Sequence, residues 1–458
     1  MKAYHKYKPH YFGNLKLAIP VVISQLGHTL VQTSDIIIIG HFAGTIALAG
    51  VSLGSSIFSV PLLIGIGISY GSTPLIAQNN GRNDYAECGQ LLSNSLFINL
   101  ITGILLFAAL SFGCIFLLNH LHQAPEVAAQ AKPFLLLLAL SIIPMLVFNT
   151  FKQFAEGLGF TKQAMLISVW GNILNICLGI IFVKGLFGVT PMGIRGVGYA
   201  TLIDRCTMAI VMSLYVFRSA RFKKYLASFS LKNIDWSRSL KIIRIGVPVA
   251  LQYTFEIGAF SGAAVIIGAI GYIELAAHQV AINLASITYM MSSGLAAAAA
   301  IKSGNYFGAK DHQNLRTSAL SSYHIVLLFM FATALLFTFG NHFLPWIYTS
   351  DHKVIFIAAQ LLIIAAFFQL FDGAQVVGLG ILRGMGDVNI PTIITFIAYW
   401  IIGLPVGYWL GIYLKVGVTG VWYGLTLGLM ASAIMLFVRF QIISRKHRYN
   451  VTPIIAKD

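Results

Sequence analysis

Twelve apolar segments dominate the pattern of hydrophobic and polar positions along the chain. Each has about the 20 residues that an α-helix needs to cross a bilayer, or more. Because backbone groups in lipid must find their hydrogen-bond partners within the segment, each segment is predicted to be a helix. The segments occupy residues 15–38, 46–75, 90–118, 133–151, 163–187, 196–217, 243–268, 273–300, 317–344, 354–381, 390–414 and 418–440.

The two halves of the chain resemble each other at an offset of just under half the chain length. The matching stretches are 15–21 with 243–249, 44–49 with 271–276, and 156–159 with 383–386. Six segments per half is an even number, so both halves enter the membrane in the same sense. We therefore predict an all-α integral membrane protein with twelve transmembrane helices in two six-helix parallel repeats, related by an axis along the membrane normal. Transporters of this type bind substrate between the repeats and alternate access by rocking them.

The predicted domains follow this repeat. They are an N-terminal six-helix bundle (residues 1–217), a basic cytoplasmic linker (218–242), a C-terminal six-helix bundle (243–441) and a cytoplasmic tail (442–458). Pro20 and Pro248 stand early in the first helix of each bundle. A proline inside a helix frees a carbonyl group and bends the helix. These two residues are candidate hinges, although a static packing kink is an equal alternative.

Composition and charge place the chain in lipid and orient it. It is 57% hydrophobic and only 10% charged, with a formal charge of +16. Of its 30 Lys and Arg residues, 24 fall at the N-terminus, in the even-numbered loops or at the C-terminus, and five fall in the odd-numbered loops. This bias predicts that both termini are cytoplasmic. The basic excess is therefore a feature of membrane topology and lipid contact, and no nucleic-acid partner is expected.

Four acidic residues lie within apolar segments, where an aspartate costs about 3 kcal/mol on insertion scales and usually faces a cavity or partner. Glu256 and Asp372 are predicted at overlapping depths near the membrane middle. Two close carboxylates ionise together only at high cost unless a cation or a shared proton lies between them. The alternative is two separately satisfied acids. The candidate cation-binding residues are Glu256, Asp372, Tyr253, Phe368 and Gln279, with possible Na⁺ at the two acids.

The other two acids lie in the N-terminal half. Asp35 is a candidate for proton or substrate coupling, with Asn175 and Thr201 as partners, unless its carboxylate only reaches to the interface. Asp204 is adjacent to Arg205, and neighbours on a helix point about 100° apart. We interpret these two residues as a structural charge clamp rather than as transport residues. The charges do not repeat between the halves, since Glu256 aligns with His28.

The sequence resembles the multidrug and toxic compound extrusion (MATE) family over nearly its whole length, and its NorM-like branch in the two acids of the seventh and tenth helices. The residues that carry the resemblance are Pro20, Asp35, Gln78-Asn79-Asn80-Gly81, Glu156-Gly157-Leu158-Gly159, Asn175, Glu256 and Asp372. The sequence departs from the family pattern at two positions. Phe368 stands where a tyrosine is frequent in these proteins, and Gly179 stands where a second asparagine is frequent.

The resemblance implies a monomeric multidrug efflux antiporter of the bacterial inner membrane. Na⁺ or H⁺ enters as cationic, amphipathic organic molecules leave. Glu256 and Asp372 then bind the cation, and Asp35 takes part in proton or drug coupling. No cofactor is implied beyond the coupling ion.

Two other classes compete with this interpretation. A flippase for a lipid-linked saccharide would need a cavity lined with Arg and Lys, but only Arg205 lies well within a predicted span. An enzyme is disfavoured, because the sequence has no HExxH, GxSxG or phosphate-binding loop. Its four cysteines also lack metal-ligand spacing.

Overall fold

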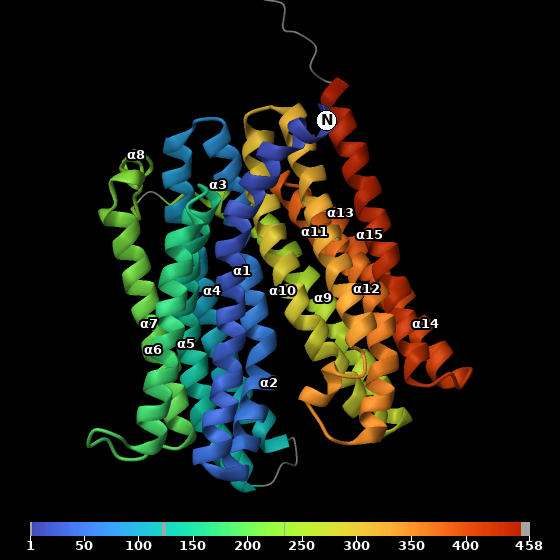
Figure 1. The fold of residues 1–458 in the computed structure, drawn as a ribbon. Helices are drawn as coiled ribbons and strands as arrows, with labels where there is room; N and C mark the ends of the chain where they lie inside the picture. Colours follow the sequence, from blue (N-terminus) through green and yellow to red (C-terminus); the bar gives the residue numbers. More distant parts are fainter. Residues whose placement is uncertain (1, 121–124, 233, 450–458) are drawn as a thin grey trace, which may run out of the picture. The chain divides into compact units, whose positions relative to one another are not determined.

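The computed structural model describes residues 2–120, 125–232 and 234–449, and the side chains of these except 2–4, 114–120 and 446–449. Over these residues the chain forms helices and connections, without a β-strand (Figure 1). The long helices are α1 (Lys2–Phe42), α2 (Gly44–Ser69), α4 (Tyr85–His120), α5 (Pro125–Gly157), α6 (Thr161–Lys184), α7 (Ile194–Arg218), α9 (Trp236–Ile270), α10 (Tyr272–Gly308), α11 (His312–Gly340), α12 (His352–Gly384) and α15 (Val418–Tyr449). The shorter elements are α3 (Ser72–Gly81), η1 (Ala220–Phe222), α8 (Lys223–Leu226), η2 (Leu344–Ile347), α13 (Asn389–Phe396), η3 (Ile397–Gly403), α14 (Leu404–Tyr408) and η4 (Trp409–Tyr413).

Eleven helical segments in the described residues are long and apolar enough to cross a membrane. In this set α2 and α3 form one segment, and α13 to η4 form another. The segments coincide with the second to twelfth apolar segments of the sequence. The first apolar segment lies in α1, which is 41 residues long. Its second half carries Gln25, His28, Gln32 and Asp35, and these polar residues make α1 less apolar than the others.

The backbone repeats in the register expected from the sequence. Helices α5 and α12 are both 33 residues long. Helices α4 and α11 begin at equivalent places, one residue after Asp84 and Asp311. Each of these aspartates accepts a hydrogen bond from a backbone N–H three residues later, at 3.0 Å. A carboxylate in this place caps the first turn of a helix. The residues just before these caps, Asn83 and Lys310, both have positive φ angles, of 62° and 58°.

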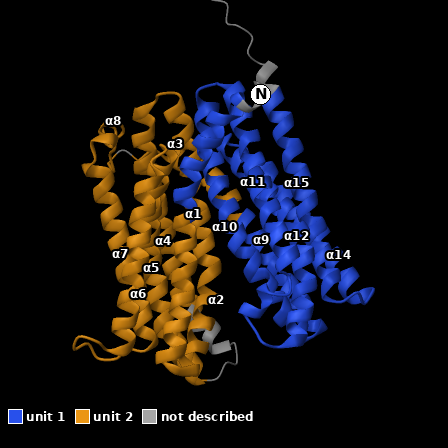
Figure 2. Cartoon of the chain, in the orientation of Figure 1, with its two compact units in different colours: residues 1–22, 252–458 blue, residues 23–251 orange. Residues whose placement is uncertain are grey.

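Contacts group the chain into two compact units (Figure 2). Unit 1 comprises Met1–Val22 and Gln252–Asp458, and unit 2 comprises Ile23–Leu251. The chain therefore passes from one unit to the other at two places, inside α1 and inside α9. The predicted bundle boundaries at 217 and 243 stay a prediction. Of the predicted tail, residues 450–458 lie outside the described residues.

In unit 1, α12 packs closely against α10. A side chain at Gly380 or Gly384 would meet the backbone carbonyl of Ala296 or Ala300. Small residues let membrane helices approach to backbone contact, where van der Waals packing holds them together. Gly403, Gly407 and Gly411 meet Gly420, Gly424 and Gly428 of α15 in the same way.

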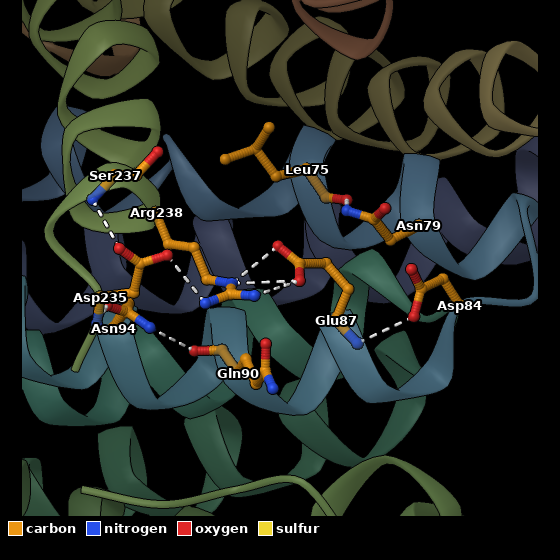
Figure 3. Close-up of polar contacts among 9 residues, drawn as sticks. All are labelled: Leu75, Asn79, Asp84, Glu87, Gln90, Asn94, Asp235, Ser237 and Arg238. Carbon is orange, nitrogen blue, oxygen red and sulfur yellow. Dashed lines mark hydrogen bonds and ion pairs between the residues drawn. The ribbon is translucent and has the colours of Figure 1, made fainter. Parts of the chain in front are cut away.

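In unit 2, α5 is the central helix and packs against α2, α4 and α7. The segment between α7 and α9 is held to α4. The backbone N–H of Ser230 donates to Ser93 Oγ, and that of Asp235 donates to Asn94 Oδ1, both at 3.0 Å. Arg238 lies between Glu87 and Asp235, at 3.0 and 2.8 Å (Figure 3). The predicted linker is thus attached to unit 2, and residues 236–242 already belong to α9.

Candidate functional site

Glu256 on α9 and Asp372 on α12 interact electrostatically within unit 1. They are 6% and 5% exposed. The hydroxyl of Tyr289, on α10, donates a hydrogen bond to the Glu256 carboxyl. One oxygen of Asp372, Oδ1, is buried without a hydrogen-bond partner among the described residues. The pair therefore has an open acceptor in a buried place, which is costly for a polar group without a ligand.

A single cationic side chain accompanies the two acids. Arg383, at the end of α12, interacts with Glu256. Its Nη2 donates to Gln252 Oε1 at 3.4 Å, and its guanidinium lies over the Tyr253 ring at 5.6 Å. Two carboxylates and one guanidinium leave the ionised cluster with one net negative charge. This balance suits one monovalent cation or one proton.

Tyr399 adds a further hydroxyl to this cluster. It lies in η3, a stretch of π-helix, and π-bulges are frequent at functional sites. Its hydroxyl exchanges hydrogen bonds with the side-chain amide of Gln375, at 2.8 and 3.1 Å. It also interacts with Glu256 and Asp372.

Three further residues were predicted for cation binding, namely Tyr253, Phe368 and Gln279, and the structure gives each a different environment. Tyr253 faces Arg383, as described above. Phe368 is buried and packs against the rings of Phe260 and Trp422, with centroids 6.1 and 5.7 Å away. Gln279 is exposed and lies ten residues before Tyr289 on α10, or about 15 Å along the helix. The structure therefore does not bring Gln279 to the two acids.

Unit 2 holds a second polar cluster that includes the predicted coupling residues. Asn175 on α6 donates to Thr201 Oγ1 on α7 at 3.3 Å. Asn175 also donates a hydrogen bond to Asp204. Asp35, on α1, interacts with Asp204 and Arg205. The structure thus places Asn175 in contact with Thr201 and Asp204, and it links Asp35 to this cluster through electrostatic interactions with Asp204 and Arg205.

Buried charges at the end of α5 were not recognised as such in the sequence. Lys152 and Glu156 are 6% and 3% exposed, with Nζ and Oε1 4.0 Å apart. Lys152 also donates to Ser24 Oγ on α1, at 3.3 Å. The sequence pattern placed Lys152 and Arg383 in even-numbered loops. The loop placement of these two residues was wrong, because both lie in helices: α5 and α12 continue past the apolar segments to Gly157 and Gly384. The aromatic residues around Lys152, at positions 148, 151 and 154, were the signal for its burial.

The two candidate hinge residues lie inside uninterrupted helices. Pro20 is in α1 and Pro248 is in α9. The chain passes between the units two residues after Pro20 and three residues after Pro248. The prolines therefore stand beside both crossing points.

The MatE family model matches residues 20–181 and, a second time, residues 248–409, so the chain belongs to the MatE family. The two matches are equally long, and they do not overlap. The chain is 33% identical over 437 residues to the probable multidrug resistance protein NorM of Xanthomonas campestris pv. campestris, with 95% of each covered. It is 33% identical over 430 residues to the multidrug resistance protein MdtK of Photorhabdus laumondii subsp. laumondii, with 93% of this chain and 94% of that protein covered.

A crystal structure of a MATE protein in complex with MaL6 has the same fold, with a TM-score of 0.88 at 21% identity. The match covers 96% of this chain and 98% of that one. The predicted twelve-helix, two-repeat fold and the resemblance to the NorM-like MATE proteins are confirmed. Members of the family are transporters, so the chain is a multi-pass membrane transporter rather than an enzyme.

Proposed function

We propose that this transporter is a secondary active antiporter, which exports cationic, amphipathic drugs or toxins in exchange for Na⁺ or H⁺. The observation that carries the proposal is the Glu256–Asp372 pair. It combines two buried carboxylates, one guanidinium and one buried oxygen without a partner. Buried acids in membrane helices usually mark ion or proton pathways. The names of the relatives as multidrug resistance proteins support an organic substrate.

In this proposal the coupling cation binds at Glu256 and Asp372, with Tyr289 and Tyr399 as neighbouring hydroxyl groups. Cation binding removes the net negative charge of the cluster and so favours one facing state. The cycle needs this differential affinity, because a ligand that bound both states equally would shift nothing. Asp35, Asn175 and Thr201 form the second coupling region, which takes a proton or contacts the drug.

The two units rock about hinges at Pro20 and Pro248. The position of both prolines beside the crossing points supports this role. The transporter acts as a monomer in the bacterial inner membrane, with both termini in the cytoplasm, as its charge distribution and family resemblance imply.

Proteoliposomes that contain the purified protein test this proposal. Uptake of the fluorescent cation ethidium is followed under an imposed Na⁺ gradient and then under an imposed pH gradient. The wild type is expected to transport under at least one gradient, which identifies the ion. The double variant Glu256→Gln with Asp372→Asn is expected to lose this transport.

A matched control replaces two acids outside the cluster, the half-buried Glu274→Gln with the exposed Asp351→Asn, and should retain transport. Full transport in the double variant of the pair would mean that Glu256 and Asp372 are structural. Absence of ethidium transport by the wild type under both gradients would favour the lipid-linked saccharide flippase.

A further inference from the structure

Arg205 on α7 has no role in the proposed cycle, yet its charge acts on both carboxylates of the unit 2 cluster. It interacts electrostatically with Asp204 and with Asp35. In the described part of the chain it makes no ion pair within 4.0 Å of either carboxylate. Its Nη1 instead donates to Ser141 Oγ at 2.7 Å, and its guanidinium lies over the Phe58 ring at 5.2 Å. These two contacts, rather than an ion pair with either acid, fix the position of the guanidinium.

Three oxygen atoms of the unit 2 cluster are buried without a hydrogen-bond partner among the described residues. They are Asp35 Oδ1, Asp204 Oδ1 and Asn175 Oδ1. Asp204 is 4% exposed and Asn175 is completely buried. A buried polar atom without a partner is rare in a folded protein and needs an explanation. Carboxylate and amide oxygens are the ligands that hard cations prefer, so the missing partner has the character of a cation.

The net charge of the cluster decides how much positive charge a bound cation can bring to it. Two ionised carboxylates and one guanidinium give one net negative charge. The neighbouring charged groups are Lys152, which is paired with Glu156, and His28, which interacts with Lys152 and Arg205. The Lys152–Glu156 pair is neutral, so it does not change the count.

We propose that Arg205 sets the charge of the Asp35–Asp204–Asn175 cluster so that the cluster accepts one monovalent cation at a time and rejects divalent cations. Arginine suits this task because its guanidinium keeps its charge at physiological pH. Without it, two carboxylates and an amide oxygen would resemble a site for Ca²⁺ or Mn²⁺. The inference rests on the proposed antiport, in which the unit 2 cluster serves coupling, and it assigns to Arg205 the selectivity of that cluster.

The test compares Arg205→Gln with the double variant Asp204→Asn, Arg205→Gln, in the full-length protein. The single variant raises the negative charge of the cluster by one, and the double variant restores it. Arg195→Gln is the matched control, because Arg195 is an exposed arginine on the same helix. Gel filtration and thermal unfolding check that each variant is folded.

Mn²⁺ binding, followed by the loss of the free-ion signal in electron paramagnetic resonance, gives a readout that does not need transport. Arg205→Gln is expected to bind about one additional Mn²⁺ per chain. The wild type, the control and the double variant are expected to lack this binding. Ethidium transport is expected to fall at least tenfold in Arg205→Gln.

Each result decides the proposal. Gain of Mn²⁺ binding in the single variant and its loss in the double variant support it, even if the wild type does not transport ethidium and the antiport proposal fails. Absence of additional Mn²⁺ binding by a folded Arg205→Gln protein overturns it. A transport defect of Arg205→Gln without additional Mn²⁺ binding would show that Arg205 acts only through its contacts with Ser141 and Phe58.

Discussion

The ends of α5 and α12 are equivalent places in the two units, and they carry charges of opposite sign. Glu156 in unit 2 corresponds to Arg383 in unit 1, since each is the last residue but one of its helix. Lys152, one turn before Glu156, corresponds to Leu379. The caps and left-handed residues repeat between the units, whereas the buried charges do not. The repeat therefore specifies the backbone, and each unit has its own arrangement of charges.

The two arrangements nevertheless have the same balance of acids and arginine. Unit 1 combines Glu256 and Asp372 with Arg383. Unit 2 combines Asp35 and Asp204 with Arg205. Each cluster retains one negative charge, although its residues occupy positions unrelated by the repeat. The units differ in the extra Lys152–Glu156 pair, and this difference gives the first prediction.

Replacing Lys152 by leucine, the residue at the equivalent place in unit 1, should produce the largest effect on stability. The change leaves Glu156 buried without its partner, which typically costs about 3–5 kcal/mol. Thermal unfolding in detergent micelles should show a clear loss of stability. The double variant Lys152→Leu, Glu156→Gln should recover much of this loss, and equal losses in both variants would argue against a stabilising pair.

Removing one acid of the unit 1 cluster should weaken coupling strongly. In Asp372→Asn the remaining Glu256 is balanced by Arg383, so little net charge is left for a cation. Truncating one partner of a buried charged pair costs about 2–5 kcal/mol, or at least roughly 30-fold in affinity. The concentration of Na⁺ or H⁺ that gives half-maximal ethidium transport should shift by at least this factor. An unchanged value would place cation coupling outside unit 1.

Replacing Tyr289 by phenylalanine should have a smaller effect on the same cluster. The variant loses one hydrogen bond to the Glu256 carboxyl, and hydrogen bonds to charged groups contribute about 1.5–3 kcal/mol. Cation dependence of transport should shift by roughly tenfold or more. In the described part of unit 2, no tyrosine hydroxyl donates a hydrogen bond to Asp35 or Asp204. A loss of protein stability without any shift in ion dependence would assign Tyr289 a packing role.

The smallest effects should be equal in the two units. Asp84→Ala and Asp311→Ala each remove a helix cap, which costs about 1 kcal/mol. Because the backbone repeats at these caps, thermal unfolding should give similar losses for both variants, and neither should change ion dependence. A large difference between the two losses of stability would show that the two caps contribute unequally, although their hydrogen-bond geometry is the same.

The sequence predicted the helices, the repeat and the proximity of Glu256 to Asp372, because all three follow from long apolar segments and rare intramembrane acids. It did not predict Tyr289 and Tyr399 as neighbours of that pair. Their approach depends on helix rotation and, for Tyr399, on the π-helical turn at η3, which has no simple sequence signal.

Burial of Lys152 and Arg383 was missed because a hydropathy segment ends at its first charge, whereas the helix continues. The approach of Asp35 to Asp204 depends on the relative register of α1 and α7, which periodicity alone does not give.

Release of a cation on drug binding tests the central claim most directly. Ethidium is added to the purified protein, either loaded with radioactive Na⁺ or in weakly buffered solution with a pH indicator. Exchange at the unit 1 cluster predicts that ethidium releases Na⁺ or protons from the wild type. It also predicts that Glu256→Gln with Asp372→Asn abolishes most of this release. An undiminished release from the double variant would contradict the assignment of the coupling cation to Glu256 and Asp372.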